Sequence, residues 1–260
     1  MRTLFKIVIT AYVAIIVQSC GSHRVYTSGS YGSLKSYTEK QHYVDKKTSK
    51  TYVSGDVSFG RHMQDGGSFD DTKTIASLNV HRNITGRSYN YYYGLGGGIG
   101  SYHFKEGYND IVDQNEKLNF YNINLKAGIN YALTTTKIDY RFIGLELLYT
   151  NEFGAYQDKL EALSKLMDED LIIVNQKSIF TYNFYSEYVF KFSTEEALSL
   201  GFYIGGLFNK MNNDDYEYGY DTEFNGFTVG LRLKKYTLHF IHETGQNDIR
   251  STKLGLTYNL

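Results

Sequence analysis

The sequence predicts an all-β chain that closes into an antiparallel, up-and-down transmembrane β-barrel of about ten strands. Three observations carry this prediction. The composition favours strands, with 26 Tyr, 16 Phe and 25 Gly but no Pro and no Trp. From Val53 onward, apolar and polar residues alternate with a period of two. The connections between the alternating stretches are short and long in turn.

The alternation predicts where the strands lie. In the stretch 197–208, for example, Leu198, Leu200 and Phe202 share one face, and Ser199 and its alternate neighbours share the other. Most of the stretches reach the nine to eleven residues that a tilted membrane strand needs. The expected strands are 53–61, 74–84, 89–104, 119–131, 138–150, 178–191, 197–208, 224–233, 236–243 and 252–260.

The rhythm of the connections favours a membrane barrel. Short connections follow every second expected strand, and the others are longer, as at 151–177 and 209–223. Short periplasmic turns and long external loops produce this rhythm in bacterial outer-membrane barrels. A soluble sandwich or lipocalin-like barrel would also alternate, but it has no reason to sort its loops. We therefore expect both ends of the barrel on the periplasmic side and the long loops outside.

The longest connection carries a helical pattern. Leu160, Leu163, Leu166 and Met167 fall on one face of a helix within 158–167. The pattern predicts a short helix that packs over the barrel mouth, or that folds inward and constricts it.

The N-terminal residues 1–19 are expected to be a signal peptide, with a basic start and an eleven-residue apolar run at 7–17 that is too short to span a bilayer as a helix. The run ends in Val17-Gln18-Ser19-Cys20, which resembles the lipobox of bacterial lipoproteins, although Gln18 departs from the usual small residue. The resemblance implies cleavage before Cys20 and lipidation of its thiol. The alternative is an ordinary signal peptide followed by an unused cysteine.

Residues 20–52 are expected to form a lipid-anchored basic tether. They are rich in Ser, Thr, Tyr, Gly and Lys and show no periodic apolar face, which is typical of a loosely ordered segment. Such a tether would lie against anionic head groups or would be a plain solvated linker. The barrel domain then occupies 53–260.

The polar faces of the strands would line the lumen if the apolar faces meet lipid. A ten-stranded barrel is narrow, so its inward side chains either fill it as a self-neutralising plug or line a narrow pore. The lumen-facing polar candidates are His81, Lys126, Glu146, Glu187, Arg232 and His239.

No residue pattern predicts a metal site or a cofactor. Cys20 is the only cysteine, and the acidic runs in the expected loops lack the spacing of an EF-hand. A net charge of −1 also argues against nucleic acid as a partner.

An enzymatic alternative comes from the strand count and from residues near the external rim. Asp70 and Asp71 are adjacent, and His62 or His103 would lie near the rim, but no His occurs in 209–223. The strand count is similar to that of the omptin family of outer-membrane proteases, which use paired Asp and an Asp-His couple at the outer mouth. The resemblance is architectural only.

The leading functional expectation is therefore a non-enzymatic outer-membrane barrel lipoprotein with a structural, adhesive or transport and secretion accessory role. It would be anchored at Cys20, with outer-membrane lipid, lipopolysaccharide and periplasmic or envelope proteins as partners. The alternatives are a narrow pore for small solutes and an omptin-like hydrolase at the external mouth.

Overall fold

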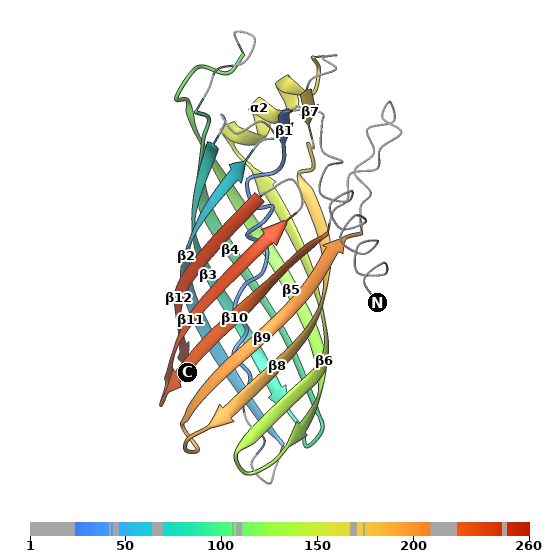
Figure 1. The fold of residues 1–260 in the computed structure, drawn as a ribbon, viewed down its shortest axis with the longest axis vertical. Coiled ribbons are helices and arrows are strands. Elements are labelled where there is room, and N and C mark those ends of the chain that lie inside the picture. The colour runs from blue at the N-terminus through green and yellow to red at the C-terminus, as the bar shows by residue number, and fades with distance from the viewer. Residues whose placement is uncertain are drawn as a thin grey trace, which may run out of the picture.

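A computed structural model shows a closed antiparallel barrel of ten strands, in the order β10-β11-β12-β2-β3-β4-β5-β6-β8-β9 (Figure 1). The fold prediction is confirmed. The described residues are 24–41, 43, 47–63, 70–105, 107, 111–166, 171–173, 175–208, 223–245 and 249–260. No helix in these ranges is long and apolar enough to cross a membrane.

Each expected strand corresponds to one barrel strand, and most of the observed strands run further than the alternation indicated. The barrel strands are β2 (Thr48–Met63), β3 (Asp70–Thr85), β4 (Tyr89–His103), β5 (Lys117–Thr134), β6 (Ile138–Phe153), β8 (Ser178–Lys191), β9 (Glu196–Leu207), β10 (Phe224–Leu233), β11 (Tyr236–Gly245) and β12 (Ile249–Asn259). The barrel closes where β12 pairs with β2, so its first and last strands are neighbours.

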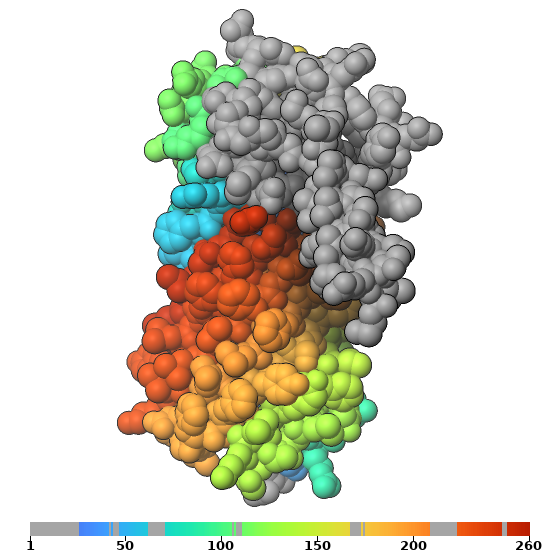
Figure 2. All heavy atoms as spheres, viewed as in Figure 1, coloured from blue at the N-terminus to red at the C-terminus, as the bar shows by residue number. Residues whose placement is uncertain are grey.

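The outer wall is apolar on every barrel strand. Phe59, Ile99, Ile123, Phe202 and Leu254 are each more than half exposed. The lower part of the face shown in Figure 2 is a continuous surface formed mainly by β8 to β12 (orange to red). A soluble monomer rarely exposes a contiguous apolar patch larger than a few hundred Å². The alternation therefore places apolar side chains toward lipid, as in a transmembrane barrel.

The connections sort to opposite ends of the barrel, as the loop rhythm predicts. The short turns lie at one end, which we call the short-turn mouth, and include the two-residue turn Lys234–Lys235 between β10 and β11. Strand β2 begins and strand β12 ends at this mouth. The amide of Leu260 donates there to the carbonyl of Thr51 over 3.0 Å. The strand ends that the long connections join lie at the opposite end, which we call the long-loop mouth.

A small lid covers the long-loop mouth (Figure 1). Its helix α2 (Ala155–Leu163) begins earlier than the helical pattern suggested and follows Gly154, whose φ is 115°. The side chains of Leu160 and Leu163 are fully buried, so the helix packs over the mouth as expected. Two short strands, β1 (Arg24–Tyr26) and β7 (Leu171–Ile173), pair in parallel beside it.

The expected tether is the largest departure from the sequence-based picture. Residues 26–41, which we call the lumen segment, begin with the last residue of β1 and run inside the barrel toward the short-turn mouth, and all of them except Ser33 and Gln41 are buried (Figure 1). Strand β2 then begins at Thr48 instead of Val53. The prediction of a loosely ordered tether is wrong for this segment, because polar residues that lack a periodic apolar face also suit the inside of a polar lumen.

Candidate functional site: a chain segment inside the barrel

The candidate site is the lumen together with the segment that occupies it. The six polar residues expected to face the lumen all lie inside the barrel, each exposed by 9% or less. They come from six different strands, because alternation turns every second side chain of each strand inward. They are His81 on β3, Lys126 on β5, Glu146 on β6, Glu187 on β8, Arg232 on β10 and His239 on β11.

The central pair joins the segment to β6. The ammonium of Lys35 lies 2.5 Å from Oε1 of Glu146, with both side chains almost fully buried. The hydroxyl of Tyr92 donates to Oε2 of the same carboxylate over 2.8 Å. A buried carboxylate needs such partners, because removing it from water costs several kcal/mol. Glu146 thus pairs with the chain's own N-terminal part.

A second charged group lies nearer the short-turn mouth. Lys40 of the lumen segment lies 3.0 Å from Glu187, which also pairs with Arg141 over 2.7 Å. Glu39, the acid next to Lys40, pairs with Arg232. Side chains of both signs on the segment therefore meet opposite charges on the wall.

Arg141 was missed by the sequence analysis, and the reason is a local irregularity in the sheet. The pairing of β6 with β8 shifts register between Arg141 and Gly144. Strict alternation counted from Glu146 would turn Arg141 toward lipid. The shift reverses the phase, so that both side chains point inward.

Three further lumen residues lie beyond or at the ends of expected elements. Lys73 and Glu152 fall just outside the expected strands 74–84 and 138–150, yet the structure buries both in the lumen. Glu152 accepts from the backbone amides of Gly29 and Ser30 over 2.8 and 2.7 Å. Lys253, on the polar face of β12, donates to the carbonyl of Lys35 over 2.8 Å.

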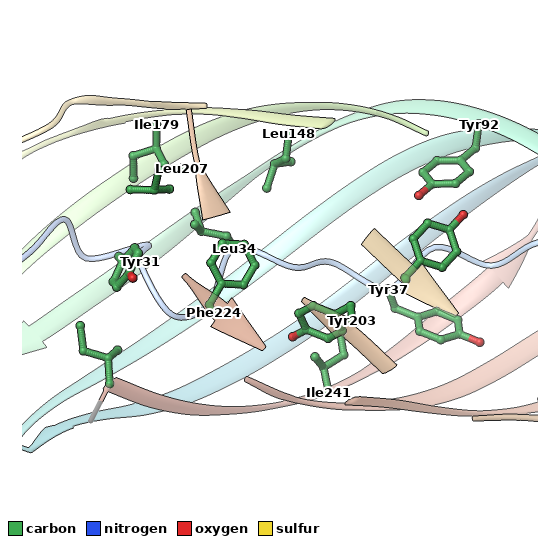
Figure 3. Packing of buried hydrophobic residues seen from close by; sticks show 12 residues of the cluster. Tyr31, Leu34, Tyr37, Tyr92, Leu148, Ile179, Tyr203, Leu207, Phe224 and Ile241 are labelled. Atoms are coloured by element: carbon green, nitrogen blue, oxygen red, sulfur yellow. The ribbon is translucent and has the colours of Figure 1, made fainter. Parts of the chain in front are cut away.

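Aromatic packing adds to these polar contacts. Figure 3 shows Tyr31, Leu34 and Tyr37 of the lumen segment among apolar residues of the wall. The ring of Tyr37 stacks on His239, with centroids 4.6 Å apart. A side chain at Gly230 would meet the Tyr37 hydroxyl at 2.1 Å, so the wall needs glycine there.

The lid holds the upper end of the segment. The hydroxyl of Tyr156 on α2 donates to the carbonyl of Thr27 over 2.7 Å. Burial raises the pKa of Tyr156, so that its phenol remains protonated and serves as a donor. The ring stacks on Tyr102, with centroids 4.3 Å apart. The lid and the lumen segment therefore share one packed core.

Little space remains beside the middle of the segment, and a cavity of about 300 Å³ lies beside its last residue, Gln41, at the short-turn mouth. Two cavities that border the middle, one near Tyr185 and one near Asn122, have volumes of about 20 Å³ each. Such a volume holds roughly one water molecule. In the part of the chain that the structure describes, the lumen is filled by the segment and by inward side chains together.

The residues considered for hydrolysis are not brought into a catalytic arrangement among the described residues. Asp71 accepts from the hydroxyl of Tyr102 over 3.0 Å and from the backbone amide of Lys105 over 2.8 Å. These contacts tie the loop after β4 to β3. The side chains of His62 and Asp70 lie outside the described residues. The hydrolase alternative stays a prediction.

The structure gives no further account of the other expected sites. Cys20 and the rest of the signal peptide lie outside the described residues. Within the described ranges, no group of three or more His, Cys, Asp and Glu is arranged to hold a metal ion.

The fold and the site define a transmembrane β-barrel whose lumen is occupied by its own N-terminal segment. Similar solved structures are bacterial outer-membrane barrels. The transport unit of the autotransporter AIDA-I from Escherichia coli is 9% identical, with a TM-score of 0.47 over 81% of this chain and 90% of that chain. An outer-membrane channel from Pseudomonas putida F1 is 8% identical, with a TM-score of 0.41 over 81% of this chain and 95% of that one.

Neisserial surface protein A is 9% identical, with a TM-score of 0.34 over 81% of this chain and 97% of that one. No protein-family model matches the sequence. No curated protein matches it either.

Proposed function

We propose that the chain is an outer-membrane barrel lipoprotein that seals its lumen with its own N-terminal segment and carries the lipidated Cys20 to the long-loop side. The observation that carries the proposal is the direction of the lumen segment. The segment begins at the long-loop mouth, where β1 (Arg24–Tyr26) pairs with β7. Its last residue, Gln41, bonds to Asn83 and Thr85 at the opposite end of the barrel.

The short length of chain between Cys20 and β1 supports the proposal that Cys20 emerges on the long-loop side of the membrane. Cys20 precedes Arg24 by four residues, which cover at most about 14 Å when fully extended. Strand β2 has 16 residues, which at a tilt of about 40° span about 40 Å along the barrel axis. We therefore expect the thiol to emerge on the side of the long loops. An anchor at Cys20 would then lie on the side opposite to the periplasmic ends of the barrel.

This arrangement suits a structural or adhesive role at the cell surface. The long loops would contact lipopolysaccharide, the acyl chains would enter the outer leaflet, and the short turns would remain available to periplasmic or envelope proteins. A filled lumen is consistent with an anchor that conducts no solutes.

Lipidation and outward threading are tested separately in a Gram-negative host. An alkynyl palmitate label should enter the wild type and be absent from Cys20→Ser. A peptide tag inserted after Ser22 should bind antibody on intact cells, whereas a tag after Leu260 should need permeabilised cells. Label retained by Cys20→Ser contradicts lipidation at that thiol. A tag after Ser22 that stains only permeabilised cells, in a folded barrel, contradicts outward threading.

A second candidate is a narrow pore that opens when the lumen segment withdraws. The observation that favours it is the polarity of the wall, where Lys126, Glu146 and Arg232 would line the empty lumen. The two candidates differ in whether the folded protein conducts ions.

A further inference from the structure

We propose that the lumen is a binding channel for an extended polypeptide, and that it recognises the main chain of its occupant more than the sequence. A polypeptide strand of similar length then binds in place of the lumen segment once that segment is released. This inference rests on the proposed function in one respect: both take the lumen that the N-terminal segment fills as the functional site.

The first support is the set of hydrogen bonds that wall side chains donate to the segment's backbone carbonyls. Cationic side chains from several strands reach them. Lys126 donates to the carbonyl of Tyr37 over 3.3 Å, and Lys253 donates to that of Ser33 over 3.1 Å. Arg141 and Arg232 both donate to the carbonyl of Lys40, over 2.9 and 2.8 Å. These bonds are independent of the occupant's side chains.

The second support is that wall side chains also accept hydrogen bonds from the segment's backbone amides. Glu243 accepts from the amides of Leu34 and Lys35 over 3.3 and 3.4 Å. Asn83 accepts from the amide of Gln41 over 3.0 Å. A closed barrel has no free sheet edge with which a strand could pair. Inward side chains of the wall take over the bonds that such an edge would provide.

The remaining contacts define the class of occupant. Between residues 26 and 41 the segment forms ion pairs with the wall only through Lys35, Glu39 and Lys40. Near the long-loop mouth the channel is tight, since a side chain at Gly29 would meet the Phe120 ring at 2.6 Å. The expected ligand is therefore an extended, polar polypeptide with small residues at its N-terminal end and charges of both signs further along.

The experiment uses the full chain with a protease recognition sequence inserted between Tyr43 and Lys47, beyond the lumen segment. The folded protein is cut in detergent, which leaves the segment held by noncovalent contacts alone. A fluorescent peptide with the sequence of residues 24–41 is then added, and its binding is followed by anisotropy. We expect saturable binding to the cut protein and none to the uncut protein.

Peptide variants separate main-chain recognition from side-chain recognition. A peptide with Lys35→Gln, Glu39→Gln and Lys40→Gln should bind with an affinity lowered by tenfold to a hundredfold. The wall variant Lys253→Met should weaken both peptides by a similar factor of about tenfold, because both bonds of Lys253 to the segment end on carbonyls, those of Ser33 and Lys35. The matched control is Lys137→Met, an exposed lysine in the turn between β5 and β6, and it should change neither affinity.

Two outcomes would overturn the proposal. In the first, the cut protein keeps its own fragment and never takes up the labelled peptide, which would make the segment a permanent part of the fold. In the second, the triple-variant peptide shows no binding at all, which would mean that the side chains carry recognition. If Lys253→Met fails to fold, as judged by gel migration before heating, the comparison of the two peptides on the unmodified wall tests the proposal. Surface labelling of uncut protein tests the proposed function independently.

Discussion

At the scale of single residues, the lumen depends on charges that are buried and paired. Glu146 forms an ion pair with Lys35 and accepts hydrogen bonds from Tyr92 and, over 3.3 Å, from Asn183. Removing one partner from a buried pair leaves an uncompensated charge, which is more costly than removing both. The ion pairs of the segment are therefore more sensitive to single substitutions than ion pairs on the surface.

The substitution Lys35→Met tests this sensitivity. It keeps the aliphatic length of the side chain but leaves Glu146 without its cation, so we expect a loss of about 3 kcal/mol in the free energy of unfolding. The double variant Lys35→Met with Glu146→Gln should recover most of the loss. The measurement is urea unfolding in detergent, followed by tyrosine fluorescence.

Lys165→Met provides the control, because its pair with Glu161 on α2 is exposed and should contribute nothing measurable. Equal midpoints for Lys35→Met and Lys165→Met would mean that the Lys35 pair does not stabilise the fold.

At the scale of elements, the sequence predicts the barrel strands well because each strand separates two environments. Lipid on one side and a polar lumen on the other impose a period of two, which is visible without any structure. Arg141 departs from this pattern because the sheet shifts register beside it. The shift appears in the sequence only as two consecutive apolar residues, Phe142 and Ile143, which do not by themselves indicate that Arg141 points inward.

The lumen segment could not be predicted in the same way. Residues 26–41 are surrounded by wall on all sides, so no face of the segment differs from the others and no period arises. Its Ser, Gly and Lys content equally describes a solvated linker. The pairing that holds it, such as Lys35 with Glu146, joins residues more than a hundred positions apart in the sequence.

The lid should stabilise the long-loop end of the barrel as a separate unit. Leu160 is fully buried in the cluster that contains Tyr26 and Tyr156. Leu160→Ala should cost about 2 to 5 kcal/mol locally, because it leaves a cavity in this cluster. We expect faster hydrogen exchange in 155–163 and earlier cleavage there by protease, with the barrel strands unchanged.

Glu161→Gln, an exposed change on the same helix, is the control for the lid and should leave exchange in 155–163 as in the wild type. If Leu160→Ala instead accelerates exchange in β5 and β6 to the same extent, the lid and the barrel unfold as one unit.

At the scale of the whole molecule, the filled lumen predicts that the folded protein does not conduct ions. Purified wild type in a planar bilayer should show no stable channel events, because the cavities beside the middle of the segment have volumes of only about 20 Å³. Cutting the protein between Tyr43 and Lys47 and washing out the released segment should produce defined conductance steps. Steady conductance from the uncut, folded protein would favour the pore over the sealed anchor.

The closure of the barrel between β12 and β2 has a consequence for how the chain reaches this state. Tyr52 pairs with Asn259, so this seam joins positions separated by almost the whole barrel sequence. Contacts between such distant positions form late in folding. Only residues 42–47 separate the lumen segment from β2, so we expect the segment to lie along the inner side of the curling sheet before the seam forms. If β12 paired with β2 before the lumen segment lay inside, the barrel would close with an empty lumen and the segment would remain outside it.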